Sequence, residues 1–339
     1  MSQELVMSRT PLRISFVGGG TDMEEYHNKF NGYAISATIN KYIFVAAKLR
    51  SDKRYQGLSP DFFKYYTTKK IQNTSPKVGH EVAITCLQEM KFKKGLDLFF
   101  TADVAPGSGL GASSSLASNL VNVILKFQGK EWDKHNIAMT VYRIGHDVLK
   151  WGIGKQDEFA AVFGGFNMYK FSKNNVTVEP IKLNTSTLKE FDDNSMLFFL
   201  GERKPSVDIL KIQARNIKSL NMKTISALHK VSELTLELRD AFRNNDLSKF
   251  ESILREGWEQ KKQFAKNITT KKIDSICHTV ELCGSKAMKV TGQGGGGHLF
   301  VYAEKKKHPK IIKNLEKLGV PYVNFKYHNT NSTVQNLSD

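Results

Sequence analysis

Two glycine-rich segments lie far apart in the chain, and each follows a stretch with the pattern of a β-strand. Residues 106–115 read Pro-Gly-Ser-Gly-Leu-Gly-Ala-Ser-Ser-Ser, and residues 292–297 read Gly-Gln-Gly-Gly-Gly-Gly. Apolar residues alternate over 98–104 and recur at helical spacing over 116–127, with Gly129 placed to end the helix. A loop of small residues at a helix start directs several backbone N–H groups and the helix dipole to one point, which suits a phosphate.

The segment at 106–115 differs from two common nucleotide-binding loops. No Gly-Lys-Ser or Gly-Lys-Thr follows its last glycine, and it lacks the GxGxxG spacing of a parallel βαβ dinucleotide fold. Taken alone, it is equally compatible with a strand-to-helix turn in which Ser113 and Ser114 cap the helix.

The remainder of the chain divides into two regions. The first is strand-rich, with strands expected at 13–17 and 42–48 around the glycine cluster 18–20, and a helix at 134–149. The second has the helix-on-antiparallel-sheet pattern of a ferredoxin-like domain. Its expected elements are a strand at 196–200, helices at 220–242 and 247–254, a strand at 299–303, a helix at 309–318 and a strand at 322–327. We therefore predict two domains, residues 1–185 and 186–339.

The composition argues against several classes of protein. No signal peptide and no apolar run of about 18 residues is visible, so we expect a cytoplasmic protein without a membrane partner. The histidines and cysteines have no spacing typical of a transition-metal site. The net charge of +17 suits nucleic acid or polyanionic small molecules, but the lysines are scattered and no arginine-rich stripe with aromatics is present. We expect no nucleic-acid partner.

Three motifs in this sequence resemble those of the GHMP kinases and occur in the same order. Residues 11–22 read Pro-Leu-Arg-Ile-Ser-Phe-Val-Gly-Gly-Gly-Thr-Asp, residues 106–114 approach the family pattern PxxxGLGSS, and residues 289–297 read Lys-Val-Thr-Gly-Gln-Gly-Gly-Gly-Gly. The resemblance implies a two-domain α+β fold, with an N-terminal α/β domain like domain 2 of ribosomal protein S5 and a ferredoxin-like C-terminal domain. It also implies a phosphotransferase that uses ATP and Mg²⁺ and has an alcohol group as acceptor.

The resemblance assigns roles to individual residues. Asp157 corresponds to the aspartate that accepts or orients the proton of the attacking hydroxyl, and Arg13 to a basic residue that stabilises charge on the phosphoryl group. The hydroxyl of Ser113 and, if it is not simply an exposed helix residue, the carboxylate of Asp147 would bind Mg²⁺. The residues expected to bind ATP are Pro106, Gly107, Ser108, Gly109, Leu110, Gly111, Ala112, Ser113 and Ser114.

The first motif also narrows the substrate. Gly-Gly-Gly-Thr-Asp, together with Gly-Lys-Gln-Asp at 154–157, is similar to the branch of the family that phosphorylates D-glycero-D-manno-heptose 7-phosphate at C1 to give the 1,7-bisphosphate. This resemblance implies a sugar phosphate as substrate, in the biosynthesis of nucleotide-activated heptose. The residues expected to bind it are Gly19, Gly20, Thr21, Asp22, Gly294, Gly295 and Gly296, with Lys155, Arg203 and Lys204 as candidates for its phosphate.

Two alternatives remain open at this point. The chain is also compatible with a sugar-1-kinase for an unphosphorylated sugar, such as fucose or an N-acetylhexosamine. The second alternative is a non-catalytic, basic nucleic-acid-binding protein built on a kinase scaffold, against which the retention of Asp157, Arg13 and Ser113 argues.

Overall fold

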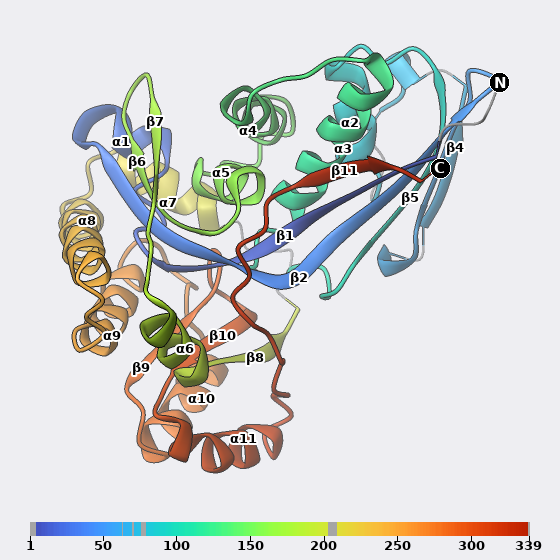
Figure 1. The fold of residues 1–339 in the computed structure, drawn as a ribbon. Coiled ribbons are helices and arrows are strands. Elements are labelled where there is room, and N and C mark those ends of the chain that lie inside the picture. The colour runs from blue at the N-terminus through green and yellow to red at the C-terminus, as the bar shows by residue number, and fades with distance from the viewer. Residues whose placement is uncertain (1–4, 63, 70, 76–78, 203–208, 338–339) are drawn as a thin grey trace.

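The computed structural model describes residues 5–62, 64–69, 71–75, 79–202 and 209–337, which form two β-sheets flanked by helices (Figure 1). The larger sheet has the strand order β11-β1-β2-β5-β3-β4, and β6 and β7 extend it from β2. Neighbouring strands are antiparallel except β3 and β5, which are parallel. The strands are β1 (Leu5–Val17), β2 (Gly32–Arg50), β3 (Tyr55–Ser59), β4 (Lys64–Thr68), β5 (Gly95–Ala102), β6 (Phe166–Phe171), β7 (Val176–Pro180) and β11 (Thr333–Asn336).

Helices between residues 81 and 163 cover one face of this sheet, and α3 packs directly on β1 and β2. Gly129 ends α3 in the left-handed conformation, as the sequence predicts. The helix expected at 134–149 is regular only to Arg143 and continues as a π-helical turn, Ile144–Val148. The helices of this half are α1 (Glu24–Phe30), α2 (Glu81–Glu89), α3 (Ala112–Gln128), α4 (Lys134–Arg143), α5 (Gln156–Phe163) and α6 (Thr185–Asn194).

The smaller sheet is antiparallel and has the strand order β8-β10-β9. Its strands are β8 (Ser195–Gly201), β9 (Ala287–Val290) and β10 (Gly297–Tyr302). The helices of this half are α7 (Ile209–Lys218), α8 (Met222–Arg243), α9 (Phe250–Lys261), α10 (Lys271–Leu282) and α11 (His308–Glu316). The apolar spacing expected along α8 is confirmed, because Leu228, Val231, Leu234 and Leu238 are all buried.

A continuous apolar core joins the two sheets. Phe16 of β1 is fully buried, and its ring contacts those of Phe191 on α6, Phe250 on α9 and Phe300 on β10. Burying a phenylalanine side chain stabilises a fold by about 1.5–3 kcal/mol, so this cluster holds the two halves in a fixed relation. The loops that carry the three motifs lie at this junction.

The prediction of a strand at 322–327 is wrong. Only two isolated bridges occur there, Phe198 with Tyr322 and Ile39 with Tyr327, because this segment crosses from the small sheet to the large one. The N–H of Val323 donates to Leu197 of β8, whereas the N–H of Tyr327 donates to the carboxylate of Asp192. The backbone groups therefore find partners one at a time and form no continuous ladder. Beyond this crossing, β11 pairs with β1.

Candidate active site

The glycine-rich loop at 106–111 has a glycine at every second position from Gly107 to Gly111, and these glycines determine its backbone conformation. Gly107, Gly109 and Gly111 have φ angles of 72°, 74° and 82°, a region that glycine adopts without strain. Gly111 is the N-cap of α3 and supplies no side-chain cap. The expectation that Ser113 and Ser114 cap this helix is wrong, since both lie within its first turn. The helix start is thereby left available to an anion.

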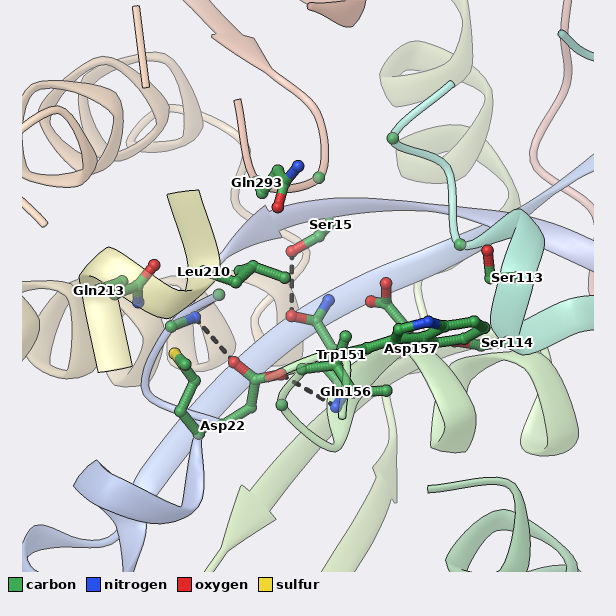
Figure 2. A pocket seen from close by; sticks show the side chains of 18 of the residues that line it. Ser15, Asp22, Ser113, Ser114, Trp151, Gln156, Asp157, Leu210, Gln213 and Gln293 are labelled. Atoms are coloured by element: carbon green, nitrogen blue, oxygen red, sulfur yellow. Dashed lines mark hydrogen bonds between the residues drawn. The ribbon is translucent and has the colours of Figure 1, made fainter. Parts of the chain in front are cut away.

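A cavity of about 420 Å³ lies between this loop, the first motif and the second half of the chain (Figure 2). Among the described residues, its lining includes only two carboxylates, Asp22 and Asp157. The basic side chains in the lining are Arg13, Lys150, Lys211, Lys261 and Lys289, which outnumber the carboxylates even when Lys289, whose pKa is lowered by burial, is left out. This excess of positive charge in a recessed site suits a substrate that carries several negative charges.

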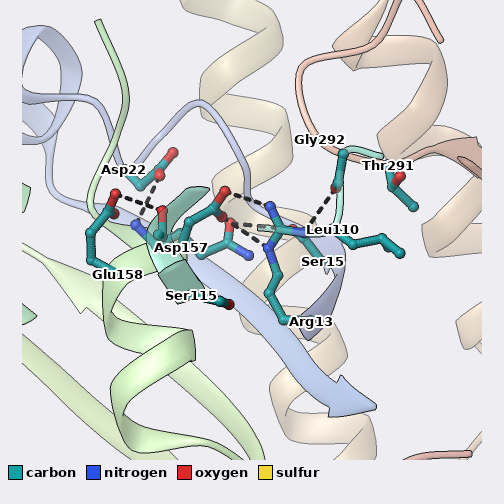
Figure 3. A network of polar contacts seen from close by, with 12 residues as sticks. Arg13, Ser15, Asp22, Leu110, Ser115, Asp157, Glu158, Thr291 and Gly292 are labelled. Atoms are coloured by element: carbon teal, nitrogen blue, oxygen red, sulfur yellow. Dashed lines mark hydrogen bonds and ion pairs between the residues drawn. The ribbon is translucent and has the colours of Figure 1, made fainter. Parts of the chain in front are cut away.

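Arg13 connects three parts of the site (Figure 3). Its Nε donates to Asp157 Oδ1 at 2.9 Å and its Nη2 to Oδ2 at 2.6 Å, a bidentate ion pair. Its Nη1 donates to the carbonyl oxygen of Gly109 at 2.9 Å. The Arg13 side chain is 4 % exposed and that of Asp157 is 36 % exposed, so the arginine is fixed and the carboxylate remains accessible from the cavity. Strand β1, the glycine loop and α5 are thus held together by one guanidinium group.

The third motif packs on the glycine loop. The side chain of His298 on β10 donates from Nδ1 to the carbonyl oxygen of Ser108 at 2.8 Å, and burial lowers the pKa of this histidine, which favours the neutral ring. A Cβ on Gly109 would approach the carbonyl oxygen of Thr291 to 2.8 Å. The two glycine-rich segments therefore touch backbone to backbone.

We expect Gly109→Ala to damage nucleotide binding, and Gly129→Ala to serve as its matched control. Both glycines have positive φ, but a Cβ on Gly129 meets nothing within 4 Å. Gly129→Ala should cost only the backbone strain, about 1–2 kcal/mol in urea unfolding. Gly109→Ala should cost more, because Thr291 must also move, and should raise KM for ATP several-fold. Equal unfolding costs and equal KM values for the two variants would contradict the close packing described here.

Asp22 stabilises the loop that contains Gly19 and Gly20 from within the cavity wall. Its Oδ1 accepts the N–H of Gly20 at 2.7 Å and its Oδ2 accepts the N–H of Gln156 at 3.1 Å. Burial, followed by the nearby charge of Asp157, raises the pKa of this carboxyl. Each carboxylate oxygen has a further lone pair, so Asp22 is able to accept a hydrogen bond from a sugar hydroxyl as well.

Several residues expected from the motifs have other positions. Arg203 and Lys204 lie outside the described residues. The remainder are described but do not line the cavity: Pro106, Leu110, Thr21, Lys155, Asp147, Gly294, Gly295 and Gly296. Thr21 is buried and donates to the carbonyl oxygens of Gly18 and Tyr33, which stabilises the turn. Lys155 pairs with Glu24 at 3.2 Å and lies over the ring of Tyr142.

The structure also places Asp147 away from the cavity. Its side chain is 57 % exposed, and its Oδ1 lies 2.8 Å from Nδ1 of His146.

The expected residues that do line the cavity are Arg13, Gly19, Gly20, Asp22, Gly107, Ser108, Gly109, Gly111, Ala112, Ser113, Ser114 and Asp157. Their roles remain predictions, but their convergence from separate parts of the chain is a feature of the structure.

Glu158 is a polar residue at this site that sequence reasoning passed over. It is fully buried beside Asp157, and its Oε1 accepts a hydrogen bond from Ser114 Oγ at 2.9 Å. Its other oxygen has no hydrogen-bond partner among the described residues. Burial and then the charge of Asp157 raise the pKa of Glu158 to about 8. The only sequence signal was its position in the first turn of α5.

We expect Glu158→Gln to change how stability depends on pH. Because the folded-state pKa of about 8 lies above the ordinary value of 4.5, the folded protein binds the extra proton, and wild-type stability falls as the pH rises from about 4.5 to 8. Glutamine keeps the shape and stays neutral, so the variant should lack this fall and should be the more stable protein at pH 8.5. Urea unfolding at pH 5.5, 7 and 8.5 measures the free energy of unfolding of both proteins. Parallel pH profiles for the two proteins would contradict the raised pKa of Glu158.

Other cavity residues had no role assigned from the sequence: Gln156 and Lys289 lie within the quoted motifs, and Gln213 and Lys261 lie in none of them. Gln156, Gln213, Lys261 and Lys289 line it from α5, α7, α9 and β9. Lys289 is buried and donates to the carbonyl oxygen of Phe16 at 2.8 Å, and burial together with Lys261 and Arg13 lowers its pKa. A lysine or glutamine in a helix or strand normally lies in solvent, so its sequence context gave no sign of burial.

Comparisons with known proteins agree with this arrangement. Residues 78–165 match the family described as GHMP kinases N terminal domain, and residues 238–319 match GHMP kinases C terminal. A D-glycero-alpha-D-manno-heptose 7-phosphate kinase from Campylobacter jejuni is 28% identical over 92% of this chain and 93% of its own length. An L-fucokinase/L-fucose-1-P guanylyltransferase from Bacteroides fragilis is 25% identical over 94% of this chain, which spans 36% of that longer protein.

Solved structures show the same fold. A D-glycero-D-manno-heptose 1-phosphate kinase from Bacteroides thetaiotaomicron superposes with a TM-score of 0.81 at 22% identity, covering 97% of this chain and 98% of that one. A Lactococcus lactis galactokinase complexed with galactose superposes with a TM-score of 0.78 at 18% identity, covering 97% and 95%.

The chain belongs to the GHMP kinases, a family whose members transfer a phosphoryl group from ATP. Within that family it is a sugar kinase, a phosphotransferase with an alcohol group as acceptor. The expected fold class, α+β with the two-part GHMP kinase architecture, is confirmed. Among the described residues, no helix is both long enough and apolar enough to cross a membrane.

Proposed function

We propose that this kinase phosphorylates the anomeric C1 hydroxyl of D-glycero-D-manno-heptose 7-phosphate to give the 1,7-bisphosphate. The observation that carries the proposal is the Arg13–Asp157 ion pair. It lies in a cavity with excess positive charge, beside the glycine-rich loop that ends at the N-terminus of α3. The similarity to a named heptose 7-phosphate kinase over nearly the full length supports the choice of sugar.

The reaction follows from the position of Asp157. Its accessible carboxylate accepts the proton of the C1 hydroxyl as the oxygen attacks the γ-phosphorus of ATP. The bond between the γ-phosphorus and the oxygen that bridges to the β-phosphate breaks, and ADP leaves with that oxygen. The guanidinium of Arg13 orients Asp157, while the N–H groups of the glycine loop and of the first turn of α3 hold the phosphates.

The site also fits a magnesium ion. The hydroxyl of Ser113 and the carboxylate of Asp157 place hard oxygen atoms at the cavity. No group of three or more His, Cys, Asp or Glu side chains in the described part of the chain is arranged to hold a metal. A Mg²⁺ ion needs few protein ligands when nucleotide phosphates and waters complete its coordination shell. When bound, it would neutralise phosphate charge, with Ser113 as the proposed ligand, whereas the exposed Asp147 is not among the residues that line the cavity.

A panel of acceptors tests the proposed substrate. ADP release with Mg-ATP should give the highest kcat/KM for D-glycero-D-manno-heptose 7-phosphate, compared with sedoheptulose 7-phosphate, mannose 6-phosphate, galactose and fucose. Phosphorus NMR of the product should show a second phosphate on C1. A higher kcat/KM for fucose would instead favour the sugar-1-kinase alternative, which the similarity to part of a protein named L-fucokinase/L-fucose-1-P guanylyltransferase supports.

A further inference from the structure

Within the part of the chain that the structure describes, two buried side-chain amides in the cavity wall have N–H groups with no hydrogen-bond partner. Gln156 is 2 % exposed and Gln213 is 4 % exposed, and both line the cavity. Neither Nε2 atom has a hydrogen-bond partner among the described residues. Leaving a buried donor unpaired costs about 1–3 kcal/mol, so each position calls for a ligand oxygen.

The two amides occupy different parts of the cavity. Gln156 precedes Asp157, and its Oε1 accepts the hydroxyl of Ser15 at 3.2 Å, which fixes the orientation of its amide near the reacting centre. Gln213 is on α7, across the cavity from Ser113 and Ser114, with Asp157 lying nearer to the serines (Figure 2). A sugar with its reacting hydroxyl at Asp157 would therefore extend past Gln156 towards Gln213.

Gly20 creates the room that the Gln213 amide occupies. A Cβ on Gly20 would approach Nε2 of Gln213 to 2.5 Å, and the φ of Gly20 is +101°. Any larger residue at position 20 would displace the amide from its position. The Gln213 amide therefore occupies its position because residue 20 has no side chain.

We propose that Gln213 binds the end of the acceptor sugar farthest from the transferred phosphoryl group, by donating from Nε2 to an oxygen of that end. The proposal deepens the function above and rests on it for the identity of the sugar. Both a phosphate oxygen and a hydroxyl oxygen accept such a bond. The cationic side chain of Lys211, two residues earlier in α7, also lines the cavity and favours the phosphate.

Two variants of Gln213 test this role. Gln213→Leu removes the donor with little change of shape, and Gln213→Glu replaces it by an oxygen that repels a phosphate. Gln335→Glu, at an exposed position on β11, is the control for the added charge. Steady-state KM values for ATP, for D-glycero-D-manno-heptose 7-phosphate and for the same heptose without phosphate are measured, with thermal unfolding as a check on folding.

Gln213→Leu should raise KM for the sugar that the wild type prefers by about tenfold, the size expected when one buried hydrogen bond is lost, while KM for ATP stays within about twofold. Gln213→Glu should then weaken binding of the 7-phosphate more than that of the free heptose if a phosphate is bound, and equally if a hydroxyl is bound. A sugar KM within about twofold of wild type in both folded variants would overturn the proposal.

The proposed substrate and the role of Gln213 can fail separately. If the wild type prefers the heptose 7-phosphate but neither variant changes its KM, the substrate stands and the role of Gln213 falls. If the wild type prefers an unphosphorylated sugar and Gln213→Leu raises the KM of that sugar, the role stands and the proposed substrate falls. Loss of affinity for ATP and sugar together, with a lower unfolding temperature, would show a structural role and overturn the proposal.

Discussion

Asp157→Asn should lower kcat by about 10²–10⁴-fold, the range that a positioned general base contributes. Asparagine has nearly the same shape and still accepts a hydrogen bond from Arg13, but it does not accept the proton of the attacking hydroxyl at neutral pH. Because Asp157 lies beside the nucleotide loop without forming it, the affinity for ATP should change little. ADP release at saturating sugar and calorimetric titration with a non-hydrolysable ATP analogue measure the two quantities.

Asp147→Asn is the matched control for this substitution. It removes the same charge ten positions earlier, from an exposed side chain outside the cavity. Both its kcat and its magnesium dependence should equal those of the wild type. A normal kcat for Asp157→Asn would remove the general base from the mechanism, and a shifted magnesium dependence for Asp147→Asn would restore Asp147 as a metal ligand.

Arg13→Ala should lower kcat by about 10²–10³-fold, as removal of a preorganised donor to developing charge does in other enzymes. The substitution leaves both oxygens of Asp157 and the carbonyl oxygen of Gly109 without their shared donor, so KM for ATP should rise as well. Arg13→Lys should recover part of kcat, because an ammonium group restores the charge but does not reproduce the planar fork that bonds three acceptors. Initial rates across ATP and sugar concentrations separate these effects.

Arg50 provides a stringent control for Arg13. It also lies in the large sheet and forms a bidentate pair, with Asp52, through contacts of 2.7 Å and 2.9 Å. That pair lies near the surface, where ion pairs contribute about 0–1 kcal/mol. Arg50→Ala should therefore retain near-normal rates. Equal losses in the two variants would mean that Arg13 acts on general stability instead of on the reaction.

Much of the site was predictable because it depends on local sequence. The glycine loop, the following helix and its end at Gly129 follow from strand alternation, helical spacing and glycine placement, which are short-range properties. The position of Asp157 next to Arg13 was expected only through the family resemblance. Their sequence separation of 144 residues leaves no local trace of the contact.

Other features depend on tertiary structure and gave no sequence signal. Gln213 lies within an ordinary amphipathic helix and lines the cavity, and Glu158, which sequence reasoning passed over, is buried beside Asp157. The segment at 322–327 has the composition of a strand, but its partners lie on two different sheets. The division at residue 185 stays a prediction, and β11 pairs across it with the large sheet.

The pairing of β11 with β1 also affects how the chain is made. Ser8, on β1, donates to the carbonyl oxygen of Thr333 across 325 positions, and Thr10 is hydrogen-bonded to Ser332. During synthesis, the outer edge of β1 therefore stays unpaired until the residues that form β11, about 325 positions later, have been added. During that interval the unpaired edge of β1 is able to pair with strands of other molecules. We therefore expect folding of this kinase in the cell to depend on chaperones.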